Sequence, residues 1–157
     1  MSRRRGVAAY ARVAGKISPR FPAKHLAHYP GLVGSDIPIW RRFIDRYAHR
    51  YVGFDYGVRV GVGGYLVYEI PENVAGLEYA TLAKRIDAVG YTKTDIETIE
   101  VKSMPGLDAI GQVISYRELF RYCYQPGKPV RAILVCDYAD PDIVYICQQL
   151  NVIITEV

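Results

Sequence analysis

The sequence predicts an α/β protein, with a mixed β-sheet flanked by helices. Half of its 157 residues are hydrophobic, which is enough for one domain with a substantial core. The run Val130 to Val135 is continuously apolar, as expected of a strand buried on both faces. From residue 85 onward, strand-like and helix-like segments alternate, and this alternation favours a sheet with helices as crossovers.

The first 34 residues predict a basic N-terminal arm, extended and partly flexible, that precedes a single domain at residues 35–157. The arm holds seven Lys and Arg, no Asp or Glu, and scattered Gly and Pro. Phosphate contact suits such an arm, and a tail that contacts nothing is the alternative interpretation.

A helix is predicted to begin at Ser35-Asp36, because Asp is a preferred N-cap and Pro38 is tolerated in a first turn. Its apolar residues recur every three or four positions and indicate one core-facing stripe: Ile37, Trp40, Phe43, Ile44, Tyr47 and Tyr51. Residues 57–62 alternate as a strand, Gly63-Gly64 indicates a hairpin turn, and residues 65–70 are the expected return strand. Residues 72–84 fit either a short helix or the start of a strand.

The second half predicts a hairpin and then alternating helices and strands. Residues 85–91 and 96–103 are the two strands of the hairpin, joined by a turn. A helix follows over residues 107–124, because Pro105-Gly106 and Gln125-Pro126-Gly127 bound it. The last expected elements are a strand at 130–135, a short helix at 143–150 that Asp140-Pro141-Asp142 starts, and a strand at 152–157.

Basic residues are concentrated in the first part of the chain. Residues 1–59 hold twelve of the twenty Lys and Arg but three of the sixteen Asp and Glu. This asymmetry predicts a polyanionic partner, and a solubilising basic surface is the alternative. The residues expected to contact nucleic acid are Arg3, Arg4, Arg5, Arg12, Arg41, Arg42 and Arg46.

Three widely spaced cysteines, Cys123, Cys136 and Cys147, fit neither a disulfide framework nor a Cys-x-x-Cys metal site. They predict buried thiols in a reducing cytoplasm. No apolar run approaches the ~20 residues of a membrane span, and no continuous apolar segment follows the basic N-terminus as it does in a secretory signal. A cytoplasmic location without a membrane partner is therefore expected.

Two carboxylates and a lysine carry the chemistry that the sequence predicts. Asp87 lies late in the first hairpin strand, and Glu100 and Lys102 lie two apart in the second, so they share one face. Neighbouring carboxylates repel unless a cation joins them, and Mg²⁺ accepts carboxylates, waters and phosphate oxygens as ligands. The pattern suits metal-assisted hydrolysis, and a surface hairpin with ordinary ion pairs is the alternative.

Gln112 and Tyr116 lie four apart on the helix that follows this hairpin, so they share one helix face. That helix face can point back at the strand ends. There the two polar side chains can contact a phosphate or a nucleobase. A half-buried helix face with satisfied polar tips is the alternative.

An Asp, a short turn, Glu-x-Lys and a helix with Gln-x-x-x-Tyr together resemble the PD-(D/E)XK nuclease superfamily, in particular its RecB-like (QxxxY) branch. The resemblance covers the chain from about Asp36 to Val157 and is to a small stand-alone protein of viral or prokaryotic type. It implies a restriction-endonuclease-like core in the order αβββαβαβ. It also implies a Mg²⁺-dependent or Mn²⁺-dependent deoxyribonuclease, active in a prokaryotic or infected host cell. The catalytic residues it implies are Asp87, Glu100, Lys102, Gln112 and Tyr116, of which Asp87 and Glu100 bind the metal.

The sequence departs from the family at two positions. Ile86 stands where the family has Pro, a frequent change, and the first helix lacks the family's acid, commonly Glu. Asp36 is preferred for that role and for the metal set because it is in line with the core stripe, whereas Asp45 lies with Arg41 and Arg42. An N-cap role is the alternative for Asp36.

The missing Glu keeps a second function open, namely a catalytically inactive nuclease-like DNA-binding or assembly protein. A protein-interaction domain with a basic tail is the third. The sequence does not separate DNA from RNA as the partner, nor an endonuclease from an exonuclease, and it leaves open a homodimer.

Overall fold

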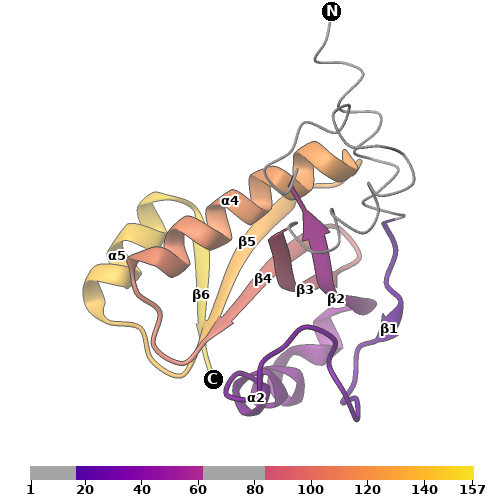
Figure 1. The fold of residues 1–157 in the computed structure, drawn as a ribbon, viewed down its shortest axis with the longest axis horizontal. Coiled ribbons are helices and arrows are strands. Elements are labelled where there is room, and N and C mark those ends of the chain that lie inside the picture. The colour runs from indigo at the N-terminus through magenta and orange to yellow at the C-terminus, as the bar shows by residue number, and fades with distance from the viewer. Residues whose placement is uncertain (1–16, 62–83) are drawn as a thin grey trace, which may run out of the picture.

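The computed structural model describes residues 17–61 and 84–157, and the predicted α/β class with a mixed sheet flanked by helices is confirmed (Figure 1). The described elements, in chain order, are β1 (Phe21–Pro22), α2 (Ile37–Tyr47), the 3-10 turn η1 (Ala48–Arg50), β2 (Gly53–Val60), β3 (Lys84–Tyr91), β4 (Ile96–Lys102), α4 (Leu107–Tyr124), β5 (Val130–Cys136), α5 (Pro141–Gln149) and β6 (Val152–Glu156). Four parts of the predictions lie outside the described residues: the turn at Gly63-Gly64, the strand at 65–70, the segment 72–83, and Arg3, Arg4, Arg5 and Arg12.

The six strands follow one another across the sheet in the order in which they occur in the chain, β1 to β6. The pairs from β1 to β4 are antiparallel, and β4–β5 and β5–β6 are parallel. Strand β4 is therefore the border between the antiparallel and the parallel part of the sheet.

Helices cover both faces of the sheet, with α2 on one face and α4 and α5 on the other (Figure 1). The α2 face of β4 is formed by Ile99 and Val101, which belong to the same buried cluster as Trp40 and Phe43. Because strand side chains alternate, Glu100 and Lys102 point to the opposite face, which α4 covers. The alternation of β4 thus sends its polar side chains toward α4.

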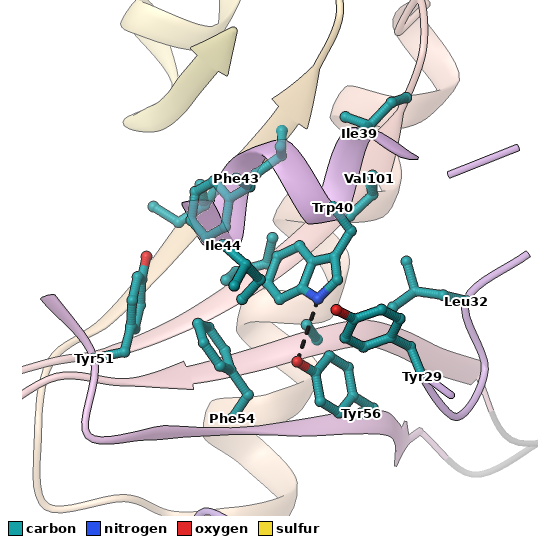
Figure 2. Close-up of a cluster of buried hydrophobic side chains, with 14 residues drawn as sticks. Tyr29, Leu32, Ile39, Trp40, Phe43, Ile44, Tyr51, Phe54, Tyr56 and Val101 are labelled. Atoms are coloured by element: carbon teal, nitrogen blue, oxygen red, sulfur yellow. Dashed lines mark hydrogen bonds between the residues drawn. The ribbon is translucent and has the colours of Figure 1, made fainter. Parts of the chain in front are cut away.

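Trp40 is the centre of the cluster under α2 and is fully buried (Figure 2). Its indole stacks on Phe43, with ring centroids 5.0 Å apart, and meets Phe54 edge-on at 5.2 Å. The indole Nε1–H donates to the Tyr56 hydroxyl at 3.2 Å, which satisfies a donor that would be costly to bury alone. The predicted core stripe therefore fixes α2 on the sheet.

Apolar residues between positions 21 and 32 pack against the same face. β1 pairs with the start of β2, and Tyr29 and Leu32 are buried in the cluster under α2. The Arg20 guanidinium binds the buried carboxylate of Asp55 through Nε at 2.7 Å and Nη2 at 2.6 Å. The division of the chain at residue 34 stays a prediction.

Strand β2 begins earlier than the sequence predicted, whereas α5 begins at the Asp140-Pro141-Asp142 segment that was expected to start it. β2 starts at Gly53 rather than at residue 57, since Gly53 to Tyr56 pair with Tyr91 to Ala88. α5 starts at Pro141 because Asp140 caps it, accepting from the backbone N–H groups of residues 142 and 143. Among the described residues, no helix has the length and apolar character needed to cross a membrane.

Candidate active site

The candidate site lies where strands β3 and β4 part. Their ladder runs from Tyr91–Ile96 to Ala88–Ile99, whereas β4 stays paired with β5 as far as Lys102. Asp87 is the next residue of β3 beyond the ladder, and its Oδ2 accepts from the backbone N–H of Val101 at 2.9 Å. The Asp87 side chain therefore accepts the hydrogen bond that a neighbouring strand would otherwise accept. This bond holds the Asp87 carboxylate beside β4.

Glu100 is 3% exposed and lies at this fork. Its Oε1 is 3.6 Å from the Nζ of Lys102, whose side chain is 36% exposed. Its Oε2 is buried and has no hydrogen-bond partner among the described residues. A buried carboxylate oxygen without a donor is costly, so it marks a place where a cation or a proton fits.

The surroundings of Asp87 and Glu100 disfavour the ionised form of both carboxyl groups. Burial raises the pKa of Asp87 to about 6, against the backbone N–H of Val101 and the charge of Lys102, which lower it. Burial and then the charge of Asp87 raise the pKa of Glu100 to about 8, and Lys102 opposes them. A divalent cation removes this repulsion, because it favours the charged form of both groups.

Asp36 lies beside this pair, at the residue before α2. It is 8% exposed and makes no capping hydrogen bond to the helix, although Ser35 Oγ lies 3.5 Å from its Oδ1. Burial raises the pKa of Asp36 and the charge of Lys102 lowers it, while the charge of Asp36 in turn raises the pKa of Asp87. The carboxylate that the sequence offered as an N-cap thus lies within electrostatic reach of Lys102.

Asp45, the other candidate for the first-helix acid, is directed elsewhere. Its side chain is 65% exposed, and its Oδ1 lies 2.6 Å from the Nε2 of His25. Of the two candidates, Asp36 is the one that lies within electrostatic reach of Asp87, Glu100 and Lys102.

Gln112 and Tyr116 project from α4 on the face that looks back at the sheet. Both side chains are half-buried and share a hydrogen bond. Burial raises the pKa of the Tyr116 hydroxyl, and the next largest cause is the negative charge of Glu100. The helix pair and the strand acids therefore lie within electrostatic reach of one another.

The basic residues of α2 have different surroundings. Arg41 and Arg46 are exposed. Arg42 instead pairs with Asp137 and donates from Nε to the backbone carbonyl of Val157 at 3.3 Å, which fastens α2 to the sheet.

A network around Asp137, which sequence reasoning missed, borders the site at the carboxyl end of β4. The Ser103 hydroxyl donates to Asp137 Oδ2 at 2.8 Å, and the backbone N–H of Asp137 donates to the Ser103 carbonyl at 3.1 Å. Its only sequence signal was position, since Asp137 directly follows the buried strand β5. The network ties the loop after Lys102 to α2, and so positions both sides of the site.

The residues present suit a metal that needs few protein ligands. Within residues 17–61 and 84–157, no group of three or more His, Cys, Asp or Glu side chains is arranged to hold a metal ion. Mg²⁺ is commonly held by one or two carboxylates, with waters and phosphate oxygens as its other ligands. Asp87 and Glu100 supply such a pair, and the unpartnered Oε2 of Glu100 is the oxygen free to bind.

Comparison with known proteins matches this chain to no known family, no curated protein and no solved structure. What the site does is therefore inferred from its own residues.

Proposed function

We propose that the protein is a metal-dependent nuclease that hydrolyses phosphodiester bonds in DNA. One observation carries the proposal: the buried, unpartnered Oε2 of Glu100 beside the Asp87 carboxylate, with the ammonium of Lys102 at the solvent side of the pair. Buried carboxylates of this kind are rare unless a cation or a catalytic role accounts for them.

The described elements support the nuclease resemblance. From α2 onward they run helix, three strands, helix, strand, helix and strand, which is the order that the PD-(D/E)XK superfamily has in its core. The Asp, Glu-x-Lys and Gln-x-x-x-Tyr residues of the sequence lie around one fork of the sheet. We therefore propose the restriction-endonuclease-like fold together with the activity.

Each side chain has a role in the proposed reaction. Mg²⁺ or Mn²⁺ held by Asp87 and Glu100 would supply Lewis acidity at the scissile phosphate and a water of lowered pKa. Lys102, which is partly exposed, orients the attacking water or offsets the negative charge that grows on the phosphoryl oxygens. Water attacks phosphorus as the bond to the leaving oxygen breaks, so the products are a phosphate monoester and a hydroxyl. Gln112 and Tyr116 support the site from α4.

The exposed basic residues of α2 are proposed to contact the substrate backbone away from the scissile bond, because α2 lies on the face of the sheet opposite Glu100 and Lys102. Arg41 and Arg46 are available there for phosphate contact, and binding through them is salt-sensitive and independent of sequence. Arg42 contributes indirectly by holding α2 in place.

A nuclease-like DNA-binding protein without cleavage is the second candidate. The observation that favours it is the lack of a third metal ligand grouped with Asp87 and Glu100 in the described part of the chain.

Digestion of plasmid and single-stranded DNA with Mg²⁺ or Mn²⁺ separates the two functions. The nuclease proposal expects cleavage by the wild type, and its loss in Lys102→Ala without loss of DNA binding. If wild type and Lys102→Ala leave DNA equally intact across both metals and across pH, the protein is no nuclease. Salt-dependent binding that survives Asp87→Ala would then support the second candidate.

A further inference from the structure

Two large apolar side chains are exposed on the loops that leave the sheet beside Lys102. Met104 is 74% exposed and lies two residues after Lys102, and Tyr138 is 51% exposed in the loop between β5 and α5. The loops after β4 and β5 leave the same end of the sheet side by side (Figure 1). Exposed apolar groups that gather beside a candidate active site mark a place where a ligand with an apolar surface fits.

Main-chain hydrogen bonds set the position of Tyr138 relative to the candidate active site. The carbonyl of Ser103, the residue after Lys102, accepts from the backbone N–H of Asp137 at 3.1 Å and from that of Tyr138 at 3.3 Å. The Ser103 hydroxyl also donates to Asp137 Oδ2 at 2.8 Å. The loop that carries Tyr138 is therefore fastened to the chain directly after Lys102.

The side chains of residues 137 and 138 have different surroundings. Asp137 pairs with Arg42 of α2, so it belongs to the α2 side of the sheet. Tyr138 follows at the parity of Cys136, the ladder partner of Lys102, and in-register neighbours in a sheet point to the same face. Within the described part of the chain, no aromatic ring stacks on Tyr138 and no group forms a hydrogen bond with its side chain. Its ring is therefore available to a ligand.

The charges near Tyr138 disfavour a phosphate at that position. Asp140 and Asp142 follow it in the chain, and both are exposed. The nearby guanidinium of Arg42 is already paired with Asp137. A nucleobase carries no charge and presents a π-face, so it suits this aromatic ring where a phosphate does not.

We propose that Tyr138 stacks on a nucleobase next to the scissile phosphate, with Met104 as a second apolar contact, and that the preferred substrate is single-stranded DNA. The inference rests on the proposed nuclease function and adds its substrate class. In a duplex each base is already paired and stacked, so a protein ring reaches its face only after unstacking, which costs free energy. A single strand offers its bases without that cost.

Cleavage of one oligonucleotide, as a single strand and as a blunt duplex in Mg²⁺, tests the inference through kcat/KM. The variants are Tyr138→Ala and Tyr138→Phe, and Tyr145→Ala is the matched control because Tyr145 is 62% exposed but lies on α5. Binding of the single strand is measured separately by fluorescence anisotropy, with each substitution added to Lys102→Ala. The probe then stays intact, and the base contact is measured apart from the chemistry.

The wild type should cleave the single strand faster than the duplex. Tyr138→Ala should lower kcat/KM and affinity for the single strand by about five- to a hundredfold, the range of one lost base–aromatic stack. Tyr138→Phe should keep both, because a phenyl ring stacks as a phenol does, and Tyr145→Ala should leave both unchanged.

Three results would overturn the inference: equal kcat/KM on the two substrates, single-strand binding that Tyr138→Ala leaves intact, or a loss in Tyr138→Phe as large as in Tyr138→Ala. A wild type that cuts neither substrate refutes the nuclease function instead. In that case the anisotropy measurements alone decide whether Tyr138 contacts a base.

Discussion

Replacing Glu100 by Gln is expected to stabilise the metal-free protein at neutral and alkaline pH. Folding buries Glu100 beside Asp87 and raises its pKa from 4.5 to about 8. A carboxyl group with a raised folded-state pKa binds its proton more tightly when folded. The free energy of unfolding is therefore highest below the unfolded pKa and falls as pH rises toward the folded pKa.

The size of the effect follows from the shift. Between pH 4.5 and 8 the folded carboxyl keeps a proton that the unfolded chain releases, which costs about 1.4 kcal/mol per pH unit. The wild type should lose about 3 kcal/mol from pH 4.5 to pH 7 through this group alone. Gln keeps the shape and does not ionise, so Glu100→Gln should retain only the smaller contribution of Asp87.

Urea unfolding in EDTA, followed by circular dichroism across this pH range, measures the difference. Glu118→Gln, the same substitution at a carboxylate that is 53% exposed, is the matched control. Addition of Mg²⁺ should restore the stability of the wild type near pH 8 and not that of Glu100→Gln. A Glu100→Gln protein that is less stable than the wild type at pH 8, or equally sensitive to pH, would refute the reasoning.

Three further predictions concern the site and the core. Lys102→Met should abolish cleavage while circular dichroism shows a folded protein, and equal kcat in both proteins on a supercoiled plasmid would contradict its role. Arg20→Ala should lower the free energy of unfolding by about 1–3 kcal/mol, because it leaves the buried Asp55 without its cation; chemical denaturation checks this, with the exposed Arg46→Ala as control. Trp40→Ala should lower the free energy of unfolding by about 3–5 kcal/mol, because it empties the centre of the α2 cluster and leaves the Tyr56 hydroxyl without the indole donor. A decrease below about 1 kcal/mol in the same denaturation assay would contradict that packing.

The sequence predicts most of the fold because the residues that begin and end its helices and strands act locally. Pro105-Gly106 and the glutamine at 125, which adopts a left-handed conformation with φ of 49°, bound α4 where the sequence placed the helix. The start of β2 was missed because nothing local distinguishes Gly53, whose place is set by pairing with Tyr91. The burial of Tyr29 was missed for the same reason, since α2 and β2 provide its surroundings.

The candidate site could be predicted in its residue types and not in its geometry. Spacing alone placed Glu100 and Lys102 on one face, and the ion pair between them follows. The bond from Val101 N–H to Asp87, and the parting of β3 from β4 that allows it, depend on the course of two strands and leave no mark in the sequence.

Crystals soaked with Mn²⁺ and measured at an anomalous wavelength test the central claim most directly. The metal-dependent nuclease proposal predicts an anomalous peak between the carboxylates of Asp87 and Glu100, with Oε2 of Glu100 among its ligands. The peak should disappear in Glu100→Gln crystals soaked in the same way. Strong anomalous peaks elsewhere on the wild-type protein, with none at this pair, would contradict the claim.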